Sequence, residues 1–351
     1  MSSIALDTTA ADQGDAGALR PPAAREEIAR MLRRALRGLH APARRVALHH
    51  FGWCEQDPAA SPGGPGGPGK MVRGTLAMQV AGAMCGDPSV ALAGAVAVEL
   101  THNSTLLKDD VMDRDVTRRQ RPTAWTVFGE SQTVLASDAL LTLAFSVLLE
   151  HPAESGLAAF RFLAKAYQDL LTGQAMDLLF ESCDRVGVDD CIRMADGKTA
   201  ALLACSTRIG AVLAGAQPYQ ADALEDFGRH LGLAFQYVDD ILGIWGDPAT
   251  TGKPAGSDIA ARKKSLPVTY ALAKGEDGSL AGFYAERTAV SRKDVARIAI
   301  AIEEAGARAW AADQAARHCS AAEESLARAG IPVERQQPLR ATARFVTARE
   351  Y

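Results

Sequence analysis

Two short acidic runs at the ends of apolar stretches have the composition of a divalent-cation site. The first, in VAVELTHNSTLLKDDVMD, contains Asp109 and Asp113, and the second, in GLAFQYVDDILGIWGD, contains Asp239. Residues four apart in an α-helix lie about 40° apart around the axis and about 6 Å apart along it, so Asp109 and Asp113 share one face. His102, two turns earlier, is rotated by about 20° from Asp109 and falls on the same stripe.

The chemistry of these side chains favours magnesium. Carboxylates on an apolar face are costly unless an opposite charge stands beside them. Donors made of oxygen alone, without Cys or His pairs nearby, are typical of Mg²⁺, which binds a few carboxylates together with substrate phosphates.

Basic residues accompany both acidic runs. They are Lys108, Arg114, Arg118, Arg119 and Arg121 around the first run, and Lys253, Arg262, Lys263 and Lys264 after the second. This pattern indicates a diphosphate substrate that is bridged to the protein through metal and clamped by Lys and Arg. For one such run a surface salt-bridge network is the better explanation, but finding the arrangement twice on apolar helices favours substrate binding.

The elements that must position these residues are helices. From Lys70 onward nearly every segment repeats apolar residues at every third or fourth position, and no stretch has strand alternation, so the sequence predicts an all-α fold. We expect helices to begin near Ser89, Ser131, Ser155, Asp189, Tyr219 and Ser291, several with a capping side chain. Polar loops are expected at 114–123 and 246–265, and the Gly and Pro residues of the second make it a candidate lid.

Composition excludes several classes of protein. The chain has 351 residues, of which 48% are hydrophobic, and its 38 Lys+Arg against 42 Asp+Glu give a net charge of −4. Such a chain can bury a large core, and without a clustered basic block it offers no footprint for nucleic acid. No run of about 18 apolar residues is present, so no membrane span is expected.

The ends of the chain and its cysteines indicate organisation and compartment. We expect a flexible leader over 1–22 and one helical domain over 23–351, with a Gly/Pro-rich loop at 56–69. The N-terminus lacks the basic and apolar regions of a signal peptide, and the six cysteines form no CxxC pair. These features favour reduced thiols and a cytoplasmic protein.

Taken together, the motifs resemble a known family. DDVMD followed by RRQRPT, with FQYVDD, TGKPAGSD and KKSLP further on, is similar to the trans-isoprenyl diphosphate synthases, which include farnesyl and geranylgeranyl diphosphate synthases. The likeness runs from about Gly69 to about Tyr270. It implies antiparallel helices around a deep central cavity (the type I isoprenoid synthase fold), a homodimer, and three magnesium ions in each active site. It also implies the reaction, in which an allylic diphosphate ionises and the double bond of isopentenyl diphosphate attacks the cation.

The resemblance also implies roles for individual residues. Asp109, Asp113 and Asp239 match the metal ligands, while Arg118, Lys198 and Lys253 match the residues that hold the allylic diphosphate. Lys70, Arg73, His102 and Arg119 match the isopentenyl diphosphate site. Thr199 and Gln236 match side chains whose dipoles face the developing cation, and Gln236 is three residues before Asp239, so both lie on about the same helical face. Lys198, Thr199, Gln236 and Lys253 are therefore the expected catalytic residues.

Four positions depart from the family pattern. Gly243 replaces the third acid of the second motif, Met71 replaces a frequent Arg, Gln120 replaces Gly, and Lys108 replaces the His that commonly precedes the first Asp. Lys108 could pair with a carboxylate or a diphosphate, but it projects about 100° away from Asp109, so a surface contact is favoured. His49 and His50 are adjacent and cannot share a helical face, which disfavours a metal site there.

Product length and reaction class follow from a few side chains. In this family, bulky aromatic residues four or five positions before the first Asp stop the product at fifteen carbons, whereas Thr105 and Ser104 stand here. An open channel permits further elongation, so we expect geranylgeranyl diphosphate, with twenty carbons. A terpene cyclase or lyase on the same fold would not need Lys70, Arg73 and His102. A non-catalytic partner subunit would not need the three metal ligands, so the transferase is favoured over both.

Overall fold

The structure is a computed structural model that describes residues 21–53, 67, 69–151, 154–248, 255–275, 278–286 and 290–347. Residues 1–20 of the expected leader and most of the 56–69 loop lie outside these ranges. The first described helix begins at Pro21, and proline is well tolerated in the first turn of a helix.

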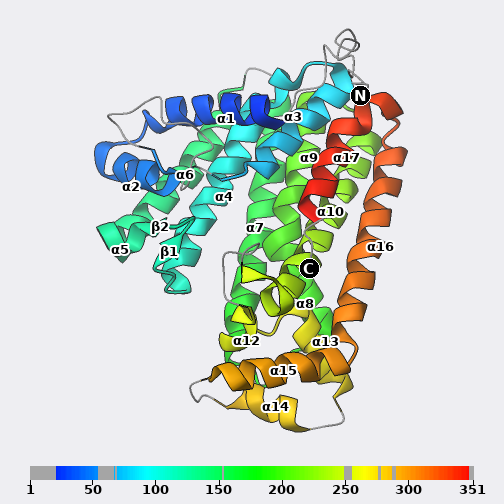
Figure 1. The fold of residues 1–351 in the computed structure, drawn as a ribbon. Helices are drawn as coiled ribbons and strands as arrows, with labels where there is room; N and C mark the ends of the chain where they lie inside the picture. The colour runs from blue at the N-terminus through cyan, green and yellow to red at the C-terminus, as the bar shows by residue number, and fades with distance from the viewer. Residues whose placement is uncertain are drawn as a thin grey trace, which may run out of the picture.

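The N-terminal half of the described chain is helical apart from one small hairpin (Figure 1). Its elements are α1 (Pro21–Leu36), α2 (Ala41–Phe51), α3 (Val72–Cys85), η1 (Pro88–Ala91), α4 (Leu92–Met112), β1 (Thr117–Arg118), β2 (Arg121–Pro122), α5 (Ala124–Phe128), α6 (Glu130–Leu149) and α7 (Glu154–Ser182). The fold class expected from the periodicity is confirmed.

The C-terminal half contributes the other long helices. Its elements are α8 (Val188–Ala195), η2 (Asp196–Ala200), α9 (Ala201–Leu213), α10 (Pro218–Trp245), α12 (Ser257–Ala260), α13 (Leu266–Lys274), α14 (Gly278–Ala285), α15 (Arg292–Glu304), α16 (Ala307–Arg328) and α17 (Val333–Thr347). The element η2 is a single π-helical turn between α8 and α9.

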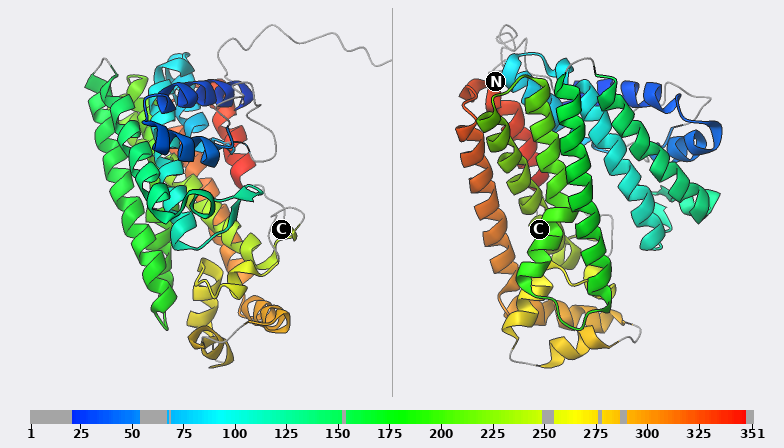
Figure 2. Two further views of the ribbon diagram at one scale, coloured as in Figure 1. Left: turned by 90° about the vertical axis from the view of Figure 1, so that its left-hand side faces the viewer. Right: turned by 180° about the vertical axis from the view of Figure 1, so that it is seen from behind.

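The long helices run side by side, and other helices lie across both ends of the bundle. In Figure 1, α7, α10 and α16 run from top to bottom, α1 lies across the upper end, and α14 and α15 lie across the lower end. The side and rear views show the same arrangement (Figure 2). Fully buried apolar side chains on α1, including Ile28, Leu32 and Leu36, join a core that α3, α4, α6 and α7 also supply.

Expected helix starts agree with the structure to within one or two residues. α6, α7, α8 and α10 begin one residue before the positions predicted for them, and Ser291 caps α15 through a reciprocal bond pair with Asp294. The region near Ser89 begins as the short 3₁₀ turn η1, where Asp87 accepts a bond from the Ser89 backbone N–H at 2.9 Å, and continues as α4.

The polar loop expected at 114–123 contains a small hairpin that the sequence did not predict. There, β1 and β2 pair in antiparallel register, with Thr117 opposite Pro122 and Arg118 opposite Arg121. The connecting residues Arg119 and Gln120 both adopt positive φ, +51° and +62°, which suits the tight turn of a two-residue hairpin. A ladder of two residues is too short to show the alternation by which strands are predicted from sequence.

Two helices of the described chain are long and apolar enough to cross a membrane. The first spans Pro88–Met112, and 72% of its most apolar window is buried in the core. The second, α6, has a mean hydropathy of 1.6 with only 33% of its window buried. Length and composition alone are weak indications, since the core helix of a water-soluble bundle meets the same criteria.

Candidate functional site

The first acidic run lies at the end of α4. Asp109 is partly buried and Asp113, which caps the helix, is exposed. Burial raises the pKa of Asp109 to about 6, opposed by the attraction of Lys198. The neighbouring Asp110 is fully buried and accepts a 2.5 Å hydrogen bond from Nε of Arg118. This bond fixes the hairpin against the end of α4 and brings Arg118 beside the first run.

The second acidic run lies at the end of α10 and is tied into the fold through Asp240. The buried Asp240 carboxylate accepts bonds from the backbone N–H of Leu266 at 2.9 Å and from Nε2 of Gln236 at 2.8 Å. Oε1 of Gln236 in turn accepts a 2.5 Å bond from Oγ1 of Thr199. Asp239, the predicted metal ligand, is exposed. The structure thus joins Thr199 and Gln236, 37 positions apart, in one hydrogen-bonded chain.

Lysines connect the two acidic runs. Lys198 forms an ion pair with Asp177 of α7 and attracts both Asp109 and Asp113. Burial disfavours the charged form of Lys263, but the carboxylates around it, Asp240 first, raise its pKa, and Asp239 is among them. The positive charge of Lys263 also opposes the rise in the pKa of Asp113 that burial causes. The two runs, about 130 positions apart in the chain, therefore border one site.

Lys198 and Thr199 lie in the π-helical turn η2, which contacts α7 on one side and α10 on the other. On one side, backbones touch: a Cβ on Gly173 of α7 would lie 2.2 Å from the backbone N of Lys198, and one on Gly197 would lie 2.7 Å from the Asp169 carbonyl. Such close approach of two backbones requires glycine. Single π-helical turns of this kind are frequent at functional sites.

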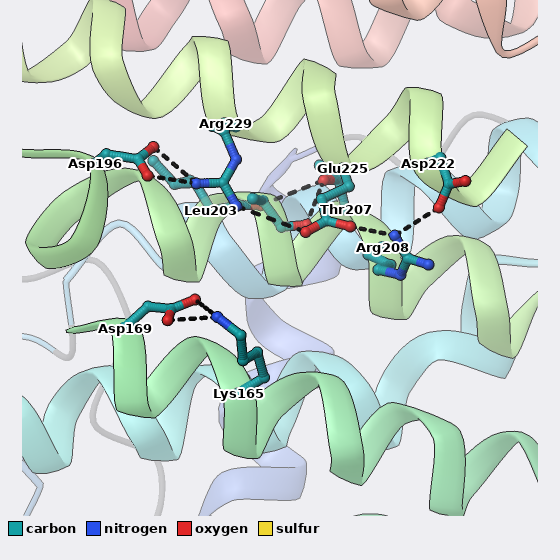
Figure 3. A network of polar contacts seen from close by, with 10 residues as sticks. Lys165, Asp169, Asp196, Leu203, Thr207, Arg208, Asp222, Glu225 and Arg229 are labelled. Carbon is teal, nitrogen blue, oxygen red and sulfur yellow. Dashed lines mark hydrogen bonds and ion pairs between the residues drawn. The ribbon is translucent and has the colours of Figure 1, made fainter. Parts of the chain in front are cut away.

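On its other side η2 is held by a chain of ion pairs (Figure 3). Arg229 of α10 donates two bonds, of 2.8 and 2.6 Å, to the carboxylate of Asp196 in the π-turn. Arg229 also approaches Glu225, which is paired with Arg208 of α9 (Figure 3). These pairs link α10 to the turn that carries Lys198 and Thr199.

A cluster of basic side chains adjoins the first acidic run. Nη1 of Arg73 lies 3.3 Å from Nε2 of His102, and burial lowers the pKa of both groups. The Arg119 guanidinium packs against Gly69, where φ is +93° and a Cβ would lie 2.7 Å from Nη2. Lys70 places its ammonium 4.9 Å from the ring centroid of Phe345 in α17. Within the described chain, Nε of Arg73 and Nη1 of Arg119 are buried without a hydrogen-bond partner, which fits a site for an anion.

Three predicted residues remain: Ser104 and Thr105, which are buried, and Lys253. Ser104 is buried between α4 and α6, where its Oγ and its carbonyl contact Oγ of Ser137 at 3.2 and 2.8 Å. Thr105 is also buried and donates to the carbonyl of His102 at 2.8 Å. Lys253 lies outside the described residues.

Lys108 makes more than a surface contact. It pairs with Asp138 of α6 at 2.8 Å, lies 3.4 Å from the Tyr167 hydroxyl of α7, and keeps only 21% of its side chain exposed. The ion pair ties α4 to α6. His49 and His50 contact different groups, the Pro122 carbonyl and Oδ1 of Asn103, as expected for adjacent residues in a helix.

Asp177 was missed by the sequence analysis, and Lys263 was noted only as one of several basic residues. The available signal for Asp177 was weak: Gln174 and Asp177 are polar residues three positions apart in α7 and thus share a face, but α7 carries several other polar residues. Among the described residues, no three Asp, Glu, His or Cys side chains are gathered in a preassembled metal site. Oxygens from a bound diphosphate would have to complete the coordination of magnesium, as they commonly do.

Comparison with known proteins agrees with this geometry. A family model described as polyprenyl synthetase matches residues 65–302. The chain belongs to the polyprenyl synthetase family. It is 42% identical over 334 residues to a (2E,6E)-farnesyl diphosphate synthase of Mycobacterium tuberculosis, covering 93% of this chain and 92% of the relative. It is 43% identical over 286 residues to a geranylgeranyl diphosphate synthase of the same organism, covering 81% of each chain.

Solved structures confirm the fold. A polyprenyl synthetase from Streptomyces coelicolor A3(2) superposes with a TM-score of 0.85 at 45% identity, covering 92% of this chain and 97% of the other. The family members are trans-prenyltransferases with the all-α type I isoprenoid synthase fold. This polyprenyl synthetase is accordingly a trans-prenyltransferase that extends an allylic diphosphate with isopentenyl diphosphate. A cyclase and a non-catalytic subunit are not favoured.

Proposed function

We propose that this polyprenyl synthetase makes geranylgeranyl diphosphate, in the cytoplasm, by magnesium-assisted ionisation of an allylic diphosphate. The observation that carries the proposal is the meeting of the two acidic runs around Lys198 and Lys263. Carboxylates bind metal ions, and ammonium groups bind phosphate oxygens. A site that contains both therefore suits a metal-bound diphosphate better than a metal ion alone or a diphosphate alone.

The donor set fits magnesium. Asp109, Asp113 and Asp239 are oxygen donors at the edge of the site, and the raised pKa of Asp109 would return toward its ordinary value beside a cation. These three residues would hold three Mg²⁺ ions together with the substrate phosphates. When bound, the ions stabilise the negative charge that develops on the leaving diphosphate.

The protein's own groups have separate tasks in ionisation. Lys198, with Arg118 and Lys253, would bind the departing diphosphate through charge-assisted hydrogen bonds. The Thr199 hydroxyl and the Gln236 amide, already bonded to each other, would orient their oxygen dipoles toward the allylic carbon as it becomes positive. Water would have to be excluded from the site, because it would otherwise quench the cation.

Isopentenyl diphosphate would occupy the basic cluster of Lys70, Arg73, His102 and Arg119. The unsatisfied Nε of Arg73 and Nη1 of Arg119 offer donors for its phosphate oxygens. Because burial keeps His102 neutral, it can donate one hydrogen bond while its other nitrogen accepts from Arg73. The positive charge of Arg118 contributes to lowering the pKa of His102 and opposes the rise in the pKa of Asp109, so Arg118 would lie between the two substrate sites.

The twenty-carbon product rests on the small side chains before the first acidic run. Neither Ser104 nor Thr105 can block a growing chain as an aromatic ring would, and each methylene buried during elongation contributes about 0.8 kcal/mol. The identities to the farnesyl and geranylgeranyl synthases differ by only one percentage point, so residue size is the better guide.

A homodimer is the proposed assembly. Leu135 of α6 and Leu179 of α7 are 60% and 59% exposed, and the two helices pack against each other. Further exposed apolar residues on these helices are Val134, Leu149, Leu157, Leu171 and Leu178. A second copy related by a twofold axis would cover such a face with the same face of its own.

A magnesium-dependent turnover assay with chromatographic sizing of products tests the proposal. We expect the wild type to convert isopentenyl diphosphate plus an allylic primer into a twenty-carbon product. Asp109→Ala should reduce kcat by about 10²–10³-fold, the usual loss for one electrostatic group, with unchanged helical content by circular dichroism. Asp313→Ala, which removes an exposed carboxylate of α16, is the matched control and should retain activity. A dominant fifteen-carbon product would overturn the product assignment, and diphosphate release without isopentenyl diphosphate at the same rate would indicate a cyclase.

A further inference from the structure

Glu99 is a buried acid that has no task in the proposed reaction. It lies on α4, three residues before His102, and only 2% of the residue is exposed. A carboxylate taken out of water is costly unless hydrogen-bond donors and positive charges surround it. The groups that surround Glu99 therefore indicate what it does.

The first of these groups is the N-terminus of α3. Oε1 of Glu99 accepts a 2.8 Å hydrogen bond from the backbone N–H of Gly74. Burial raises the pKa of the Glu99 carboxyl, and backbone hydrogen bonds from Gly74 and Arg73 lower it. These N–H groups belong to the first turn of α3, where a side chain at the N-cap position normally binds them. Met71 holds that position, makes no side-chain capping bond and has a φ of +48°, so Glu99 caps α3 from the neighbouring helix.

This cap depends on the close approach of α3 and α4. A Cβ on Gly74 would lie 3.0 Å from Cγ of Glu99 and 3.0 Å from the carbonyl oxygen of Ala95, which is also on α4. Both distances are shorter than most side-chain contacts. Glycine at position 74 therefore lets α4 place a carboxylate directly against the first turn of α3.

The second group consists of the two buried guanidinium groups of the basic cluster. Burial lowers the pKa of Arg73 and of Arg119, and the negative charge of Glu99 opposes this change in both. In return, the two guanidinium groups oppose the rise in the pKa of Glu99. A carboxylate beside two cations reduces their mutual repulsion and favours their charged forms. Nε of Arg73 and Nη1 of Arg119, which have no hydrogen-bond partner in the described chain, remain available to phosphate oxygens.

We propose that Glu99 is a positioning residue for isopentenyl diphosphate, which holds Arg73 and Arg119 in place and does not itself bind the substrate. The inference rests on the proposed binding of this substrate at Lys70, Arg73, His102 and Arg119. Through its hydrogen bond, Glu99 fixes the start of the helix that carries Arg73 and follows Lys70. Through its charge, Glu99 holds together two guanidinium groups that would otherwise repel each other.

Steady-state kinetics of the full chain with Mg²⁺, isopentenyl diphosphate and an allylic primer tests this assignment. Glu99→Ala removes both the cap and the charge, whereas Glu99→Gln keeps an oxygen that can accept from the Gly74 N–H and removes only the charge. Thr101→Val is the matched control, because Thr101 is fully buried on the same helix and donates a 2.9 Å bond to the Ala97 carbonyl. Two positions along a helix, it points about 160° away from Glu99.

We expect Glu99→Ala to raise the KM for isopentenyl diphosphate about thirtyfold and Glu99→Gln about fivefold, as for the loss of bonds to a charged group. The kcat and the KM for the allylic primer should each change by less than about threefold, because only the binding of one substrate is weakened. Thr101→Val should lower Tm and leave both KM values within about twofold of the wild type. In an Arg73→Ala background, Glu99→Gln should raise the KM by less than about twofold, because one of the groups that Glu99 positions is gone.

The assignment is overturned if Glu99→Gln leaves the KM for isopentenyl diphosphate unchanged, or if a folded Glu99→Ala raises the KM values of both substrates equally. If Glu99→Ala does not fold, the result for Glu99→Gln decides. An unchanged KM for isopentenyl diphosphate in Arg73→Ala would instead overturn the proposed substrate site, so the two failures are distinguishable.

Discussion

We expect single side chains before the first acidic run to set the space for the prenyl tail. Ser104 is buried against Ser137, so an aromatic ring at 104 cannot remain in the α4–α6 contact without overpacking it. We predict that Ser104→Phe shifts the main product from twenty toward fifteen carbons and lowers the free energy of unfolding by about 1–3 kcal/mol. Product chromatography and denaturant unfolding measure the two effects. Ser137→Ala, which removes a hydroxyl without adding volume, should leave product length unchanged; an unaltered product from Ser104→Phe would refute the size argument.

At the scale of elements, the placement of Lys198 and Thr199 depends on the π-turn η2 and on the α10 side chain that holds it. Arg229 is bonded to the carboxylate of Asp196 within the turn (Figure 3). We predict that Arg229→Ala lowers kcat about tenfold, or about 1.4 kcal/mol of transition-state stabilisation, with little change in KM for isopentenyl diphosphate. Arg229→Lys should recover part of the loss, because one of the two bonds can re-form.

Arg208→Ala is the control for this prediction. Arg208 pairs with Glu225 and Asp222 in the same network but makes no contact with Asp196. Its loss should affect unfolding more than kcat. Equal losses of kcat in the Arg229 and Arg208 variants would mean that the network stabilises the helices in general rather than the turn.

For the whole molecule, we expect the exposed apolar face of α6 and α7 to form the dimer interface. We predict a dimer by light scattering after gel filtration, and a shift to monomer in Leu135→Glu, because a charge on a desolvated twofold face is unpaired in both copies. Ile300→Glu, at a 58% exposed position on α15, is the matched control and should remain dimeric. A monomeric wild type at micromolar concentration, or recovery of the protein only with membranes, would contradict the proposed dimer.

Local periodicity was sufficient to predict much of the chain. Helical register alone places Asp109 and Asp113 on one face, and apolar spacing predicts the all-α class and most helix starts, because these properties depend on residues within a few turns. The same locality explains why the hairpin at 114–123 was not predicted, since a two-residue ladder gives no periodic signal.

Contacts between distant segments were decided only by the tertiary structure. Lys263 interacts with carboxylates of both acidic runs, Lys198 pairs with Asp177, and Lys108 pairs with Asp138. Each of these contacts joins residues from separate segments of the chain. The same holds for Asp258, whose Oδ2 lies 2.3 Å from the place where a Cβ on Gly243 would stand, 15 positions earlier in the chain. Spacing along one helix fixes direction about its axis, but how two helices pack depends on the volumes of all the side chains between them, which no local pattern encodes.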